Sequence, residues 1–446
     1  MKIISYCLGV ALLSFLFMGK ADAGEVQIDF EQFTLDNGLE VILHQDESTP
    51  IVAVSMMYNV GSKDEEPDRT GFAHFFEHLM FEGTKHIPRG EYFQLIQNAG
   101  GRVNANTSFD RTFYFQTLPS NQLELALWME SERLLHPKID EEGMETQREV
   151  IIEEKNQVLD NQPYGNMLEQ VAKNAYSEHP YQWVPIGAEQ DIYEATREDF
   201  ESFFENFYVP ENAVLSIAGD IDIEETKELA EKYFGGIPSG EGEVPRVDIE
   251  EPPLGGEVRD TVYDNIQLSA PVMAYRIPER GTEEFYAIEL IEHILSTGNS
   301  SRLQKNLVQE EQVAAQVGAF SMGLEDPGLK IIFAMANQGV GPDVAEEHIQ
   351  KEIERLQEEK VGERELEKVL NQIRSQQIQR FSSVENIAES LADYHTFEGD
   401  ANKVNTKMER YESITPEDIK EVANEYLRDD NRVVLYYLPE GEQAQN

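Results

Sequence analysis

Two histidines and a glutamate stand within five positions of one apolar stretch, GFAHFFEHLMFEGT, residues 71–84, in a chain with only nine histidines. On a helix capped by Thr70, His74 and His78 lie one turn apart and Glu77 shares their side. Two neutral imidazoles beside a carboxylate are the ligands and the base that a catalytic zinc ion uses. The spacing therefore predicts a zinc site, and a hydrogen-bonded cluster of core histidines is the alternative.

A catalytic zinc ion needs a third protein ligand and an open position. The other histidines form no second cluster along the chain, which favours a carboxylate as the third ligand. The acidic run ETQREVIIEEKNQ, residues 145–157, has helical character and offers Glu149, Glu153 and Glu154. Spacing alone does not separate these three, and each of them is also compatible with a solvated helix face.

The elements that must position these residues form two units of similar length. A segment rich in Gly, Pro and Glu, residues 236–258, has neither helical nor strand periodicity and is predicted to be a linker. It separates an N-terminal metal-binding domain, residues 24–235, from a C-terminal domain, residues 259–446. Strand-like and helix-like runs alternate in both parts, which indicates an α+β fold.

A repeated pattern relates the two units. TREDFESFFENFYVPENAVLSI starts at Thr196, and TPEDIKEVANEYLRDDNRVVLYY starts at Thr415. Each has a capping threonine, acids in the first helical turn, an asparagine 16 positions after the threonine and then a β-branched strand. The repeat predicts two related α/β domains, each an antiparallel sheet with helices packed on it.

The first residues and the net charge indicate where the protein is located and which partners it can bind. Residues 1–23 contain an apolar run and an A-x-A pattern that ends at Ala23, which predicts a cleaved signal peptide, with an uncleaved anchor as the alternative. The single cysteine, Cys7, lies inside that segment. We expect an exported protein of a Gram-negative periplasm, with no membrane span after cleavage. The net charge of −49 argues against nucleic acid as a partner. It favours a solvated acidic surface, and attraction of basic peptides is the alternative.

Three motifs together carry a resemblance: GFAHFFEHLMFEGT, GGRVNANTSFDRTFY and REVIIEEKNQ. In combination they resemble the inverzincin metallopeptidase family M16, which includes pitrilysin, insulin-degrading enzyme and the mitochondrial processing peptidases, in its short two-domain branch. The resemblance implies a clam-shell of two domains in which His74, His78 and Glu154 bind Zn²⁺ and Glu77 is the general base. Gln147 stands where family members often carry another glutamate, which leaves the support of the metal site open.

The resemblance also implies how a peptide is held. An extended substrate would lie against an edge strand near Asn104 and Ala105, by β-augmentation. The second domain of the family normally supplies an Arg and a Tyr that clamp the substrate, and alignment puts Val308 and Ala315 at those positions. Neither side chain donates a hydrogen bond. We therefore expect a heterodimer, in which a related chain without the zinc motif carries the clamp.

The predicted function is that of a zinc metalloendopeptidase subunit that hydrolyses unstructured peptides or protein segments. A peptide-binding or scaffold subunit without activity is the alternative from another class, and the absent clamp favours it. The complete H-x-x-E-H motif weighs against it, because a scaffold does not need a glutamate between two histidines.

Overall fold

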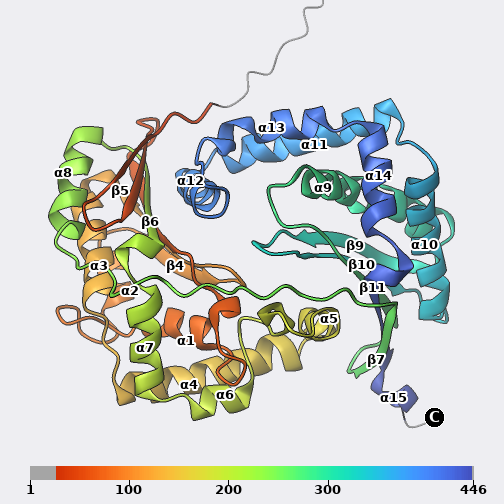
Figure 1. Cartoon of the computed structure of the whole chain (residues 1–446), viewed down its shortest axis with the longest axis horizontal. Coiled ribbons are helices and arrows are strands. Elements are labelled where there is room, and N and C mark those ends of the chain that lie inside the picture. Colours follow the sequence, from red (N-terminus) through yellow and green to blue (C-terminus); the bar gives the residue numbers. More distant parts are fainter. Residues whose placement is uncertain (1–26, 444–446) are drawn as a thin grey trace, which may run out of the picture.

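The computed structural model describes residues 27–443 of the chain. Two β-sheets, one in each half, lie side by side with helices around them (Figure 1). The predicted signal peptide, residues 1–23, lies outside the described residues and stays a prediction. Within the described part, no helix combines the length and the apolar character needed to cross a bilayer.

The sheet of the first half has six strands in the order β1-β2-β6-β3-β5-β4. All neighbours are antiparallel except β2 and β6, which run parallel. The predicted antiparallel sheet is confirmed except at this pair, where β6 returns to the sheet through a long helical connection rather than a hairpin. The strands are β1 (Glu31–Thr34), β2 (Glu40–Gln45), β3 (Ile51–Tyr58), β4 (Arg102–Thr107), β5 (Thr112–Pro119) and β6 (Ala213–Gly219).

The sheet of the second half repeats this plan with five strands in the order β7-β11-β8-β10-β9. Its one parallel pair, β7 with β11, occupies the place of β2 with β6. The order therefore matches β2-β6-β3-β5-β4 strand by strand. The strands are β7 (Val258–Asp264), β8 (Ala270–Arg276), β9 (Ala314–Met322), β10 (Leu329–Ala336) and β11 (Arg432–Pro439).

The helices follow the same repeat. The first half contains α1 (Phe72–Leu79), α2 (Tyr92–Asn98), α3 (Leu123–Leu135), α4 (Glu141–Lys155), α5 (Met167–Ala175), α6 (Glu189–Glu194), α7 (Arg197–Phe207) and α8 (Ile223–Phe234). The second contains α9 (Glu283–Ser296), α10 (Pro342–Glu358), α11 (Glu363–Arg380), α12 (Val384–Glu398), α13 (Lys403–Ser413), α14 (Pro416–Tyr426) and α15 (Glu440–Gln443). A π-helical segment, Gln304–Glu310, lies between α9 and β9 as α2 lies between α1 and β4. By order along the chain, α1 therefore corresponds to α9, α4 to α11, α5 to α12 and α7 to α14.

The predicted repeat at the end of each half is confirmed. The capping boxes at α7 and α14 are both formed, with Thr196 bonded to Asp199 and Thr415 bonded to Asp418. The asparagines of the pattern also act alike, because each donates its side-chain amide to the last turn of its helix, over 2.8 Å in the first half and 2.9 Å in the second. These bonds fix the turn that leads from each helix into a central strand.

Each half covers the sheet of the other half with one of its helices. The helix α12 of the second half packs on β3 and β6 of the first sheet, and α5 of the first half packs on β8 and β11 of the second sheet (Figure 1). In β3, Val52, Val54 and Met56 face the core of their own half, whereas Ala53 and Met57 face α12. The central strands are apolar on both faces because both faces are covered.

Two further features join the halves. Residues 236–257, inside the predicted linker, contain no helix or strand and run from α8 to β7 (green in Figure 1). The buried Lys63 pairs with Asp110 of its own half, at 3.4 Å, and with Glu325 in the β9–β10 turn. Asp110 also accepts the backbone N–H of Glu325, at 3.0 Å. The charge of a buried lysine is therefore neutralised from both halves at once.

Candidate metal centre

The helix α1 carries the predicted trio but begins differently from the prediction. Gly71 is the N-cap, with a left-handed φ of 87° that favours glycine. The prediction that Thr70 caps the helix was wrong, because its hydroxyl is bonded to Asp191 and to the backbone N–H of Ala188. Glu65 takes the capping role instead: its carboxylate accepts the backbone N–H groups of Gly71 and Ala73 at 2.9 and 2.8 Å. Burial raises the pKa of Glu65 well above its usual value, while these two bonds oppose the rise.

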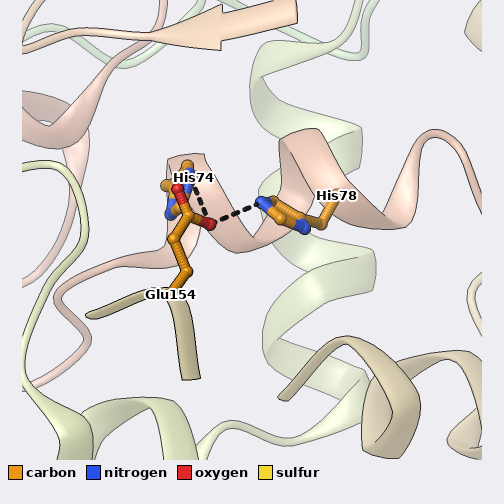
Figure 2. A group of neighbouring side chains, drawn as sticks. All are labelled: His74, His78 and Glu154. Carbon is orange, nitrogen blue, oxygen red and sulfur yellow. Dashed lines mark ion pairs between the residues drawn. The ribbon is translucent and has the colours of Figure 1, made fainter. Parts of the chain in front are cut away.

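Three side chains converge beside α1, as Figure 2 shows. Oε2 of Glu154, on α4, lies 3.8 Å from Nε2 of His74 and 3.4 Å from Nε2 of His78. All three ligand atoms lie within 4.8 Å of one another, and no second group of three such residues occurs among residues 27–443. The structure thus separates the three carboxylates that spacing left open, because Glu149 and Glu153 are exposed on α4.

The neighbouring groups shift the pKa values of the two histidines in opposite directions. Burial, and then the neighbouring His78, lower the pKa of His74 to about 4, so that its imidazole is neutral. Burial opposes the charged form of His78 as well, but its contacts with Glu154 and Gln147 raise its pKa. The contact with Glu154 lowers the pKa of that carboxyl, which is therefore ionised. Two imidazoles and one carboxylate in this arrangement fit Zn²⁺.

Gln147 provides the support that the sequence left open. Its Oε1 lies 3.0 Å from Nδ1 of His78, and its amide nitrogen donates to Glu82. Because the amide nitrogen is engaged by a carboxylate, the amide oxygen faces the ring and accepts the hydrogen on Nδ1. Nε2 of His78 is then left as the atom that can bind a metal.

Glu77 lies on the same side of α1 and is held by a residue that sequence reasoning missed. Thr107, the last residue of β4, donates its hydroxyl to Oε2 of Glu77 over 2.6 Å. Burial raises the pKa of Glu77, while this bond opposes the rise. The motif NANTS contains Thr107, but only the fold brings β4 against α1.

Asn104 and Ala105 lie in the middle of β4, which is the outermost strand of the first sheet. Asn104 is exposed and Ala105 is half-buried, as expected for neighbours that point to opposite faces. An edge strand offers unpaired backbone groups to an extended peptide. The same strand ends at Thr107, which touches Glu77, so the edge leads directly to the metal centre.

Val308 and Ala315 lie in the second half. Val308 is half-buried against the core of that half, and Ala315 is exposed near the start of β9. Neither provides a hydrogen-bond donor from its side chain. The role of their positions as a missing substrate clamp stays a prediction.

Family models match most of the described chain. Residues 40–184 match the model described as insulinase (peptidase family M16), and residues 194–373 match the model of the M16 inactive domain. The chain is 30% identical to the zinc protease PqqE of Helicobacter pylori, over 92% of this chain and 93% of that protein. It is 25% identical to a probable mitochondrial-processing peptidase subunit beta of Arabidopsis thaliana, over 89% of this chain and 76% of that protein.

Solved structures share the fold. A protease from Helicobacter pylori superposes with a TM-score of 0.89 at 29% identity, and the match covers 93% of this chain and 100% of that one. An M16-like peptidase from Alicyclobacillus acidocaldarius shares the fold at 22% identity, with a TM-score of 0.82 over 93% of this chain and 99% of that one.

Helix α1, which follows β3, carries H-x-x-E-H, the motif of the inverzincin metallopeptidase class. Within that class, this chain belongs to peptidase family M16.

Proposed function

We propose that this chain is the zinc-bearing subunit of an endopeptidase that hydrolyses unstructured peptides or protein segments. The observation that carries the proposal is the set of His74, His78 and Glu154 around one point, with Glu77 beside it on the same helix face. The names of its relatives as zinc proteases support the same reading.

Different residues would bind the metal ion, transfer the proton and position the base. His74, His78 and Glu154 would hold Zn²⁺, which when bound activates water and polarises a carbonyl group. Glu77 takes a proton from the attacking water and delivers it to the leaving amine. Thr107 holds the Glu77 carboxylate in place through the 2.6 Å hydrogen bond.

The substrate would bind along the free edge of β4, at Asn104 and Ala105. Main-chain hydrogen bonds to an edge strand read an extended backbone rather than particular side chains. This mode suits unstructured segments, because their backbone N–H and C=O groups are not already paired within a fold.

A related second chain would complete the site. Val308 and Ala315 offer no donor to a scissile carbonyl, and stabilisation of the developing charge is a large part of catalysis. We propose a partner with the Arg and Tyr pair and without the zinc motif, working with this chain in the cell envelope that the predicted signal peptide indicates. High activity of this chain alone would count against the need for that partner.

The test is hydrolysis of a quenched fluorescent, unstructured peptide by the full chain, with and without the candidate partner. Glu77→Gln should lower kcat by about 10²- to 10⁴-fold and leave one zinc ion per chain. The matched control is Glu153→Gln, one residue from the ligand Glu154 but exposed, which should keep full activity. Chelator-insensitive cleavage, or full activity of Glu77→Gln, would overturn the proposal. Peptide binding without cleavage, even with the partner present, would favour the scaffold instead.

A further inference from the structure

The second half contains a counterpart of the metal helix. In the repeated topology, α9 follows β8 as α1 follows β3, and β9 and β10 take the places of β4 and β5. The α9 sequence from Glu289 to His293 is ELIEH, where α1 has HFFEH. Glu289, Glu292 and His293 therefore stand at the positions of His74, Glu77 and His78.

The correspondence extends to side-chain contacts. Ser321, near the end of β9, donates its hydroxyl to Oε2 of Glu292 over 2.8 Å. In the first half, Thr107 at the end of β4 makes the same bond to Glu77. A hydroxyl from the edge strand thus holds the glutamate of the helix in both halves.

Lysines neutralise the carboxylates of the second half. Nζ of Lys330, on β10, lies 2.9 Å from Oε2 of Glu292, and Nζ of Lys407, on α13, lies 3.9 Å from Glu289. Tyr411 also donates its hydroxyl to Glu289 over 2.7 Å. Because ammonium groups already lie next to these carboxylates, a divalent cation at this place would be repelled.

A cavity of about 760 Å³ adjoins this counterpart helix, a volume in the range of known ligand sites. Helices α9, α11, α12 and α13 contribute its walls. Glu289 and His293 line it from α9, and Gln376 lines it from α11. Since α11 corresponds to α4, which carries Glu154, the same pair of elements surrounds the cavity and the metal centre.

The arginines that line the cavity are paired with carboxylates. Arg280 binds Asp393 of the lining with both terminal guanidinium nitrogens, and Arg380 binds Glu389, which lies outside the lining, at 2.9 Å. Together with Lys407 and Glu289, these pairs leave little net charge for a ligand. The site therefore does not suit a strongly ionic molecule.

Neutral groups remain to bind a ligand. Burial lowers the pKa of His293, and its buried Nδ1 has no hydrogen-bond partner within residues 27–443. The side-chain amides of Gln376 and Gln379 lie at the exposed side of the cavity. Five aromatic rings complete the lining: Phe285, Tyr286, Phe381, Tyr394 and Tyr411. Amides and an imidazole match the peptide group, and the rings accept apolar side chains.

The cavity also lies where the halves meet. One of its walls is α12, which packs on β3 and β6 of the first sheet, whereas α9 belongs to the core of the second half. Asn386, Ser390 and Asp393 face the cavity from α12. A molecule bound here contacts both α9 and the helix that covers the first sheet.

We propose that this cavity is a second peptide site, which binds an uncharged, aromatic-containing peptide segment without cutting it and thereby holds α12 against α9. The choice of a peptide rests on the proposed function, since the corresponding place in the first half is the proposed hydrolytic site. Neutral hydrogen-bonding groups, aromatic rings and carboxylates already paired with lysines or arginines favour this ligand over an ion or an acidic metabolite.

The test uses the full chain with Glu77→Gln, which prevents hydrolysis, and the capped peptide N-acetyl-Gly-Phe-Gly-amide. Calorimetry should give a dissociation constant of about 1 mM or tighter, unchanged when zinc is removed by a chelator. Hydrogen exchange of the α12 amides should slow when the peptide is bound. The same peptide with a free carboxylate should bind more weakly.

Two neighbouring substitutions on α11 form a matched pair. Gln376→Trp fills the cavity and should weaken binding by about ten-fold or more, whereas Ser375→Trp, exposed but outside the lining, should not. Equal binding by both variants, no binding at all, or unchanged exchange of α12 would overturn the proposal. Binding that disappears with zinc would place the peptide at the metal centre, which overturns the second site but agrees with the proposed function.

Discussion

The same hydroxyl–carboxyl hydrogen bond occurs in both halves, but the charged groups around it differ. In the first half, a threonine holds Glu77 beside the neutral His74, beside His78 and beside an ionised glutamate, a ligand set that suits a divalent cation. In the second, a serine holds Glu292 beside a buried lysine. One backbone plan therefore positions a set of candidate metal ligands in the first half and an internal ion pair in the second, and a few side chains make the difference.

The largest expected effect comes from removing one of the histidines. His74→Ala should abolish stoichiometric zinc binding, because two remaining ligands do not make a stable site. His293→Ala, at the counterpart of the second metal-helix histidine, should leave the zinc content unchanged. Metal analysis of the purified variants after dialysis measures both. Full zinc retention in His74→Ala would contradict the assignment of the metal centre.

The buried lysine of the second half should make stability depend on pH. Burial lowers the pKa of Lys330 from 10.5 to about 8. Between about pH 8 and pH 10.5, Lys330 is protonated in the unfolded chain but not in the folded chain. The free energy of unfolding therefore rises with pH in this range, whereas below about pH 8 this group adds no pH dependence. The slope is at most about 1.4 kcal/mol per pH unit.

Lys330→Met should remove that contribution to the slope. Urea denaturation of both proteins at several values between pH 7 and 10 gives the comparison, because all other titrating groups are shared. Parallel curves for the two proteins would show that Lys330 does not titrate in this window.

A smaller effect is expected from the shared hydroxyl. Thr107→Val removes the hydrogen bond to the carboxyl group of Glu77 and should lower kcat by about ten-fold, with KM and zinc content unchanged. Thr107→Ser should restore the rate, and Ser321→Ala should leave hydrolysis unaffected. A fall in zinc content would instead show that Thr107 supports the metal ligands.

Much of the metal centre was predictable because its residues are close in sequence. The spacing of His74 and His78 places them on one helix face whatever the fold. Glu154 needed the family resemblance, because only the packing of α4 on α1 distinguishes it from Glu149 and Glu153.

The sequence was less informative where contacts span the chain. Threonine is a common helix N-cap residue, but Thr70 is bonded to Asp191, far along the chain. Glu65 instead accepts the free backbone N–H groups at the start of α1. Likewise, the apolar pattern of α12 predicts a buried face but not which sheet buries it. The ELIEH stretch of α9 is recognised as the counterpart of HFFEH only after the strands of the two sheets have been matched.

The exchange of α5 and α12 has a consequence for synthesis of the chain. The first sheet lacks the cover on one face until residues 384–398 have left the ribosome, and the backbone N–H of Ile28 is bonded to Asn405, 377 positions away. Contacts of such separation form late and slowly. A nascent first half therefore presents an apolar sheet to its surroundings, and a gene fragment encoding either half alone should yield aggregates rather than a domain.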